Sequence, residues 1–280
     1  MRLALSFVAA CALSSCVFVL NANEKAYEER NYTFDGSGVK LVEVYTYNGS
    51  LVIDVNETSS TEVNCDARFY ATGKTELIAQ DRLQEMTVIG SSDGETLRLE
   101  VPEHSVLGTS NVGARLELDL PKGVRVDLRT SNGNVDFESA FDQPIVRTSN
   151  GNVNLRAASG PIKVRTSNGR VDIQDWDAPG AVEVKSSNGG IDYFGGSMDF
   201  ELVTSNGPVF LEIPAGWNGK GFVHSSNGNV HIQSKGRLQA NMKASTSNGR
   251  VSISGPEMDG DGTLTVETSN GSVNVDHNSN

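Results

Sequence analysis

The chain has 280 residues, of which 37% are hydrophobic and 21% charged, a balance that excludes a disordered chain and favours a folded one. Only 6% are aromatic and 29 residues are glycine, so the core must consist mainly of Val, Ile and Leu between many turns, which favours β structure. The net charge of −12 opposes binding to nucleic acid or to an anionic membrane through overall charge.

Residues 1–22 have the order of a bacterial export signal: a basic start, an apolar run from Leu3 to Leu13, and then Ser14-Ser15-Cys16. We therefore expect export to the bacterial cell envelope, in the periplasm or at the outer membrane. The segment resembles the lipobox of bacterial lipoproteins, which implies cleavage before Cys16, acylation of that cysteine and a membrane anchor. The apolar run continues to Leu20, however, which favours cleavage near Ala22, and an uncleaved anchor is a third alternative.

Residues 23–120 are expected to form a β-rich N-terminal cap that continues into the rest of the fold. Apolar and polar residues alternate in four strand-like segments, Lys40–Val55, Glu62–Phe69, Leu97–Val101 and Arg115–Leu120. Thr75–Met86 is the stretch expected to form a short helix. Cys65 alternates with Val63 and Ala67, which predicts a buried and inert thiol.

Residues 121–280 repeat the tripeptide Ser-Asn-Gly at intervals of about 18 to 22 residues, a period typical of stacked repeats. The repeated asparagines are Asn132, Asn150, Asn168, Asn188, Asn206, Asn227, Asn248 and Asn270. Tyr47-Asn48-Gly49 resembles a degenerate earlier copy. Apolar residues alternate on both sides of each turn, as in Ile162, Val164, Val171 and Ile173, so each repeat contains two strands.

These repeats predict an all-β fold, a parallel β-solenoid (β-helix) with two strands per coil, and we expect the right-handed form. Counting from Val164 in steps of two places Thr166 and Asn168 inside. An unpaired buried amide costs about 1–3 kcal/mol, so we expect the asparagines to bond one another in an interior ladder. Asn also tolerates the left-handed backbone of a tight corner, and the Gly after it avoids a clash.

The alternative is that each Asn-Gly forms a two-residue hairpin turn between antiparallel strands, with Val164 facing Ile173. Hairpins gain nothing from the same Thr and Asn at every turn, whereas a stack requires identical residues at identical depth. We therefore favour the solenoid.

Two columns of outward charge follow from the repeat. The cations Arg129, Arg147, Arg165 and Lys185 precede the turns and form a candidate surface for an anionic ligand. The carboxylates Asp136, Asp172 and Asp192, with Asn154 between them, follow the turns. Either the aspartate column and the acidic surface neutralise the cations, or the cations bind an anionic glycan or another envelope polymer.

With the Thr-Ser-Asn-Gly series, the junction ARLELDLPKGVRVDLRTSNGNVDF and the N-terminal signal, the chain resembles the bacterial "putative adhesin" family of β-strand-repeat proteins of unknown function. The similarity covers about Lys40 to Val275. It implies a β-solenoid at the cell envelope and defines no catalytic residues.

We therefore interpret the chain as a non-enzymatic, adhesin-like binding or scaffolding protein. The alternative is a lyase or hydrolase of acidic polysaccharides, since such β-helix enzymes cluster carboxylates and a basic residue on one outer face. The sequence contains no nucleophile motif and no phosphate-binding glycine loop, and His224 and His231 flank one turn without a third ligand. We expect no catalytic residues, no metal and no cofactor.

The expected partners are an envelope glycan or protein, a membrane if Cys16 is acylated, and no nucleic acid. The last coil ends at Val275 with only five residues to follow. An uncovered parallel edge favours pairing with another strand, so we also expect self-association through the C-terminal edge.

Overall fold

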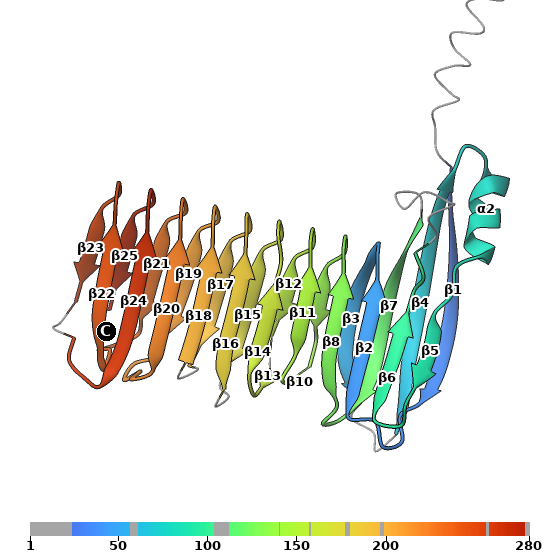
Figure 1. Ribbon diagram of the computed structural model, residues 1–280, viewed down its shortest axis with the longest axis horizontal. Coiled ribbons are helices and arrows are strands. Elements are labelled where there is room, and N and C mark those ends of the chain that lie inside the picture. Colours follow the sequence, from blue (N-terminus) through green and yellow to red (C-terminus); the bar gives the residue numbers. More distant parts are fainter. Residues whose placement is uncertain are drawn as a thin grey trace, which may run out of the picture.

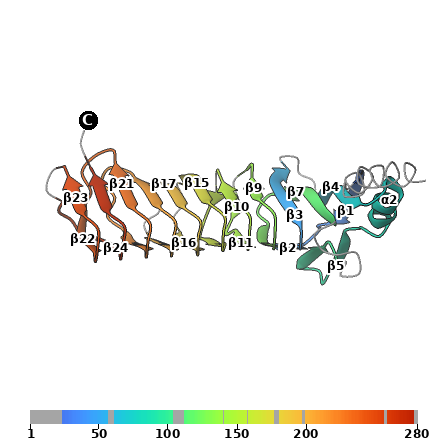
Figure 2. The same cartoon turned by 90° about the horizontal axis from the view of Figure 1, so that it is seen from above.

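The computed structural model describes residues 24–56, 61–103, 112–139, 141–156, 158–176, 180–196, 199–255 and 258–277. Its strands lie side by side along a rod (Figure 1), in which two sheets face each other (Figure 2). Strands from successive repeats pair in parallel, so each repeat is one coil of a β-solenoid with two strands. The hairpin alternative is therefore wrong.

Each sheet takes one strand from every coil. Sheet A has the strand order β1 (Glu24–Asp35), β4 (Glu62–Gly73), β7 (Val112–Pro121), β3 (Gly49–Asn56), β9 (Val135–Phe137), β12 (Val153–Leu155), β15 (Val171–Trp176), β17 (Ile191–Gly195), β19 (Val209–Ile213), β21 (Val230–Ser234), β25 (Val273–Asp276) and β23 (Val251–Ser254). Sheet B has the order β5 (Ile89–Ser92), β6 (Thr96–Glu100), β2 (Leu41–Thr46), β8 (Arg125–Thr130), β11 (Ile145–Thr148), β14 (Ile162–Arg165), β16 (Ala181–Ser186), β18 (Asp199–Thr204), β20 (Lys220–Ser225), β24 (Gly262–Thr268) and β22 (Ala240–Thr246). A short parallel pair, β10 (Phe141–Asp142) and β13 (Ala158–Ser159), joins two of the connections between coils.

The core is a thin layer of aliphatic side chains between the two sheets. Successive side chains of a strand point to opposite faces, so every second residue turns inward and the polar residues between them stay outside. Val153, Val171, Ile191 and Val209 occupy one register position in successive coils, and each is at most 1% exposed. Small β-branched side chains suit this narrow space, which explains why the chain needs few aromatic residues.

The N-terminal end of the rod is built differently from the coils. β1 and β4 pair antiparallel, as do β5 and β6. The predicted helix is α2 (Glu76–Gln84), in which Ala79 and Leu83 are buried, and it packs on β1 and β4. Thr75 caps the helix, because its side chain accepts a hydrogen bond from the backbone N–H of Ile78 at 3.3 Å. These elements form the N-terminal end of the rod, where β1 is the edge strand of sheet A and β5 that of sheet B.

The buried polar group at every corner except that of the outermost coil is the threonine or serine before Ser-Asn-Gly. Thr204 is fully buried, and its hydroxyl accepts a hydrogen bond from the N–H of Gly207 at 3.2 Å. It donates to the carbonyl of Gly189, in the preceding coil, at 2.9 Å. Ser225 repeats both contacts. One hydroxyl thus satisfies two backbone groups that would otherwise be left without partners.

The repeated asparagines form a ladder along the outside of the corners, where their side chains are exposed, and this corrects the expected interior position. Each Nδ2 donates to the Oδ1 of the asparagine in the adjacent coil at 2.6 or 2.7 Å. The ladder runs in the order Asn48, Asn132, Asn150, Asn168, Asn188, Asn206, Asn227, Asn270 and Asn248. The chain bends directly after the threonine, so counting in steps of two fails across the corner.

The corner glycines are required by close stacking of the backbone. A Cβ at Gly169 would lie 1.7 Å from the carbonyl oxygen of Gly151, and the other Ser-Asn-Gly glycines would clash similarly, at 1.7 to 2.0 Å. Neither these glycines nor the asparagines before them have a positive φ. The expectation of a left-handed corner is therefore wrong, and contact between coils is the reason for glycine.

Both ends of the rod contain a displaced coil. The first coil, β2 and β3, lies inside the coil formed by β6 and β7. The last coil in the sequence, β24 and β25, lies between β20 and β21 on one side and β22 and β23 on the other. The open C-terminal end is therefore the coil Ala240–Ser254, which corrects the expectation that the last coil forms the edge.

Candidate functional site

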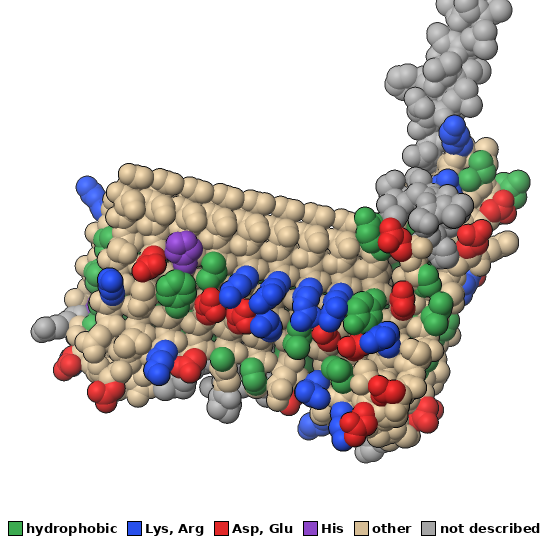
Figure 3. Space-filling view, in the orientation of Figure 1, with side chains coloured by type: hydrophobic (Ala, Val, Ile, Leu, Met, Phe, Trp, Pro, Cys, Tyr) green, Lys and Arg blue, Asp and Glu red, His purple; other side chains and the backbone are tan. Residues whose placement is uncertain are grey.

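The four predicted cations lie together on the outer face of sheet B. Arg129, Arg147, Arg165 and Lys185 occupy one register position on β8, β11, β14 and β16, and we call them the basic column. Figure 3 shows the row of Lys and Arg side chains across the middle of this face, beneath the uncharged ridge of the corners. Their side chains are 38% to 51% exposed, so a ligand can reach them.

Carboxylates two residues before the cations share the same face. Asp127 accepts hydrogen bonds from Arg129 at 3.1 Å and from Arg147 at 2.6 Å. Glu183 pairs with Lys163 at 2.7 Å, Arg165 at 3.1 Å and Lys185 at 3.2 Å. Each carboxylate therefore serves more than one cation.

The shared ion pairs alter the acidity of the groups in this site. Hydrogen bonds from Lys163, and then from Arg165 and Lys185, lower the pKa of Glu183 to about 2. The hydrogen bond to Glu201 raises the pKa of Lys185, and the hydrogen bond to Asp127 raises the pKa of Arg129. The raised pKa values of Arg129 and Lys185 favour the charged form of these two members of the basic column.

The outer face of these four strands carries more positive than negative charge. It holds the basic column together with Arg125 and Lys163, six cations in all, against the two carboxylates Asp127 and Glu183. Among the described residues, Arg125 has no ion pair. This local surplus stands out in a chain with a net charge of −12.

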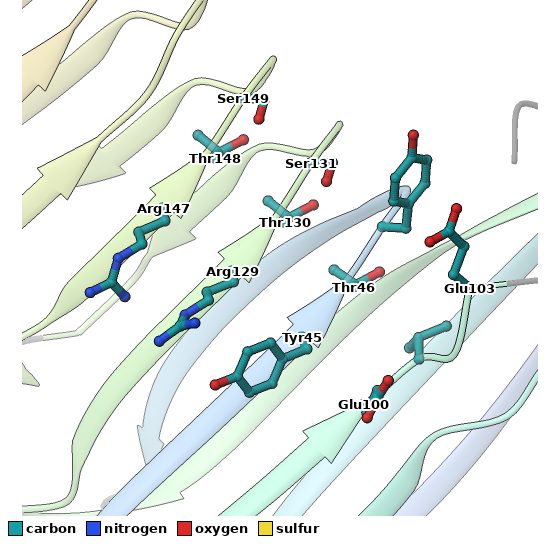
Figure 4. Close-up of a pocket in the computed structure, with 12 residues that line it drawn as sticks. Tyr45, Thr46, Glu100, Glu103, Arg129, Thr130, Ser131, Arg147, Thr148 and Ser149 are labelled. Carbon is teal, nitrogen blue, oxygen red and sulfur yellow. The ribbon is translucent and has the colours of Figure 1, made fainter.

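A groove of about 310 Å³ lies at the end of the basic column nearest the cap. Figure 4 shows Arg129 and Arg147 reaching out on one side, Glu100 and Glu103 on the other, and Ser131 and Ser149 on the corner turns above. Tyr45 lies beside Arg129, whose guanidinium carbon is 5.0 Å from the ring centre. The groove thus combines two cations, two carboxylates, hydroxyls and aromatic rings, which suits recognition of a polar ligand.

The predicted aspartate column lies on sheet A, the other face of the rod. Asp136, Asn154, Asp172 and Asp192 share one register position on β9, β12, β15 and β17. Asn154 donates to Asp136 at 2.5 Å, and Arg170 pairs with Asp192. The two columns therefore cannot neutralise each other, and the carboxylates that accompany the basic column are those on its own face.

Other candidate groups do not add to the site. Cys16 and the export signal lie outside the described residues. Cys65 is buried, and this burial raises the pKa of its thiol to about 12, which makes the thiol inert as predicted.

His224 and His231 lie on different sheets, and no group of three or more potential ligands in the described part of the chain is arranged to hold a metal. Nor does any helix among those residues have the length and apolarity needed to cross a membrane.

Sequence reasoning missed the residues that complete the site, namely Asp127, Lys163 and Glu183. The signal for them was present, because residues two positions apart on a strand share a face. Counting back by two from each cation would have found all three.

The chain matches the family model described as Toastrack DUF4097 over residues 50–280. Similar solved structures include a "putative adhesin" from Bacteroides fragilis, 11% identical, covering 89% of this chain and 97% of that chain with a TM-score of 0.40. A second from Parabacteroides merdae is 10% identical, covering 90% and 95% with a TM-score of 0.38. A "putative cell adhesion protein" from Clostridium sporogenes is 12% identical, covering 90% and 100% with a TM-score of 0.30. None of the curated proteins compared matches. Since the family model spans most of its length, the chain belongs to the Toastrack DUF4097 family.

Proposed function

We propose that this chain is a non-enzymatic, adhesin-like protein of the bacterial cell envelope that binds an anionic glycan along sheet B. The observation that carries the proposal is the surplus of positive charge on β8, β11, β14 and β16 in an otherwise acidic chain. Parallel strands lie about 4.8 Å apart, so the basic column offers one cation per coil to a linear polymer that carries regularly spaced carboxylates. Such a polymer would lie along the rod and across the strands.

The groove at the cap end supports a glycan rather than a compact anion. Tyr47 is 37% exposed, and an exposed ring beside hydroxyl groups suits a sugar, which has both apolar and polar faces. Ser131 and Ser149 offer hydrogen bonds to sugar hydroxyls, while Arg129 and Arg147 face the anionic groups.

The envelope location rests on residues 1–22, and we propose that Cys16 carries the lipid anchor. Cells producing the chain would be labelled with a fatty-acid analogue. Incorporation into the wild type and none into Cys16→Ser is the expected result. Equal labelling of both, or of neither, would remove the anchor and leave cleavage near Ala22 or an uncleaved signal.

The binding test compares two charge reversals of equal size. The variant Arg147→Glu plus Arg165→Glu changes the basic column, while Arg115→Glu plus Lys235→Glu changes two exposed cations outside it. On an array of acidic and neutral glycans, we expect the first variant to bind acidic glycans at least roughly tenfold more weakly and the second to bind like the wild type. Equal binding by wild type and the column variant would remove the basic column from the function.

The enzyme alternative has one observation in its favour, because Asp172 and Asp192 are register neighbours with Arg170 beside them. Against it, Asp192 is 7% exposed and engaged with Arg170, and the Oδ1 of Asp172 is buried. A substrate would have to displace neighbouring side chains to reach either carboxylate. Cleavage of an acidic glycan that Asp172→Asn abolishes would establish the enzyme, and intact glycan after incubation is the result we expect.

A further inference from the structure

The C-terminal end of the rod leaves both sheets open (Figure 1). β22 is the last strand of sheet B and β23 the last of sheet A, so each has one backbone edge without a neighbouring strand among the described residues. Their inward side chains are also uncovered. Val251 and Ile253 are 38% and 48% exposed, whereas Val273 and Val275, their partners in the adjacent coil, are fully buried.

The protection that usually blocks edge pairing is weak at this end. Soluble proteins protect edge strands with charges, proline, bulges or a covering element. β22 and β23 carry one charged residue, Lys243, and no proline. The opposite end of the rod, by contrast, has the charged antiparallel strand β1 and the helix α2. At that opposite end, β5 is the edge of sheet B and its four residues are exposed, so the two ends differ mainly in the covering of sheet A.

We propose that the open end binds the open end of a second copy, which gives a two-fold dimer and a rod of twice the length. A cover for this end must offer two strand edges at the separation of the two sheets, with an apolar face between them. A second copy of the coil Ala240–Ser254 has both features. The proposal rests on this end alone and is independent of glycan binding on sheet B.

The charge of Lys243 favours one of the two possible strand pairings in such a dimer. A two-fold axis perpendicular to the rod makes every pair of strands across the interface antiparallel, either β22 with β22 and β23 with β23, or β22 with β23 twice. The first arrangement brings together the two strands that carry Lys243, and like charges across a strand pair are destabilising. The second joins each β22 to the partner's β23 and keeps the corners on the same side.

The second arrangement also fits the side chains. With the corners level, Thr246 lies opposite Val251 of the other copy and Ala244 lies opposite Ile253. All four residues point inward. In each pair the smaller side chain, Thr246 or Ala244, packs against the larger one, so the apolar core continues across the interface. Lys243 then faces Ser254, which carries no charge.

Analytical ultracentrifugation of the purified chain over a range of concentrations tests the dimer. We expect a monomer–dimer equilibrium in the wild type, and a loss of association of about a hundredfold in Ile253→Lys, because a charge then faces the apolar end. Gln233→Lys is the control, since it adds the same charge to the outward face of sheet A on β21, two strands away from the open end. A wild type that stays monomeric at high concentration, or an Ile253→Lys variant that dimerises like the wild type, would overturn the proposal.

Cross-linking tests the pairing independently of affinity. Ser245 and Ser252 lie on opposite outer faces within one chain and opposite each other across the proposed interface. A variant with both Ser245→Cys and Ser252→Cys should form a covalent dimer under mild oxidation, and each single variant should not. Cys65 is buried and does not interfere. A covalent dimer from Ser245→Cys alone would contradict this arrangement, as would no covalent dimer from the double variant.

Discussion

Thr46 and Thr204 occupy equivalent corners and differ only in what lies beyond them. The Thr204 hydroxyl bridges Gly207 and Gly189, whereas the Thr46 Oγ1 is buried without a hydrogen-bond partner among the described residues. The coil outside Thr46 is made by β6 and β7, and the sequence between these two strands contains no Ser-Asn-Gly. Within the described part of the chain, the column of corner hydroxyls therefore begins with one that has no hydrogen-bond partner.

The two threonines should respond in opposite ways to valine. Thr204→Val leaves a buried N–H and a buried C=O without partners, so we expect the free energy of unfolding to fall by about 1–3 kcal/mol. Thr46→Val removes a buried hydroxyl that has no hydrogen-bond partner among the described residues, and should leave stability unchanged or raise it. Urea unfolding of both variants measures this. An equal loss in both would show that the bridging hydroxyl does not stabilise the corner.

Gly189 and Gly190 are adjacent residues with different surroundings. A Cβ at Gly189 would lie 1.7 Å from the carbonyl oxygen of Gly169, while at Gly190 the nearest atom would be 3.3 Å away. We expect Gly189→Ala to destabilise the fold by about 1–3 kcal/mol through overpacking, and Gly190→Ala to change it little. Thermal or urea unfolding of the pair decides this, and similar stabilities would contradict the close-stacking explanation for the corner glycines.

At this scale, the sequence predicted that Thr, Asn and Gly form a repeated corner, but it did not predict that the asparagine lies outside the coil. Period-two counting was valid as far as Thr166 and failed at Asn168, because the backbone turns between them. The ladder itself needed only identical residues in register, which the repeat supplied. Whether the ladder lies inside or outside depends on how sharply the backbone bends after the threonine. The alternation of residue types does not show that bend.

Neighbouring strands of sheet B are joined by shared carboxylates, and Glu183 is the most heavily shared. Its folded pKa is about 2, below the value of about 4.3 for an unfolded chain. A lowered folded pKa stabilises the fold above the unfolded pKa, and this contribution is lost as pH falls toward the folded one.

The stability difference between wild type and Glu183→Gln should accordingly be greatest above about pH 5 and shrink as the pH falls from about 4.3 toward 2. Chemical unfolding at several pH values measures this difference directly. A difference that stays constant from pH 7 to pH 2 would show that the ion pairs on β14 and β16 do not stabilise the rod.

The strand pairs and the helix could be predicted because alternation and capping are local signals. The coil order at the two ends could not. Each coil presents nearly the same edges, so the coil β22–β23 and the coil β24–β25 could both follow β20–β21 as far as sequence pattern shows. Only the folded structure shows that β22–β23 is the outermost coil, because Val251 and Ile253 are exposed there.

On the scale of the whole molecule, the chain is a rod with two unlike faces and two unlike ends. The alternation of the repeat predicted one basic and one acidic column, and the structure places them on sheets B and A. The distribution of charge between the faces depends on which strand of each coil joins which sheet. An acidic chain with a basic stretch on β8, β11, β14 and β16 would orient an anionic polymer toward that stretch before contact.

The central claim is that this polymer lies along the basic column with one charge per coil. It is tested most directly by the affinity of the wild-type chain for a series of oligogalacturonates of increasing length at one salt concentration. We expect affinity to rise with each added residue until the oligomer spans the four cations from Arg129 to Lys185, and then to level off. Equal affinity for the shortest and the longest oligomers, or none for any, would contradict it.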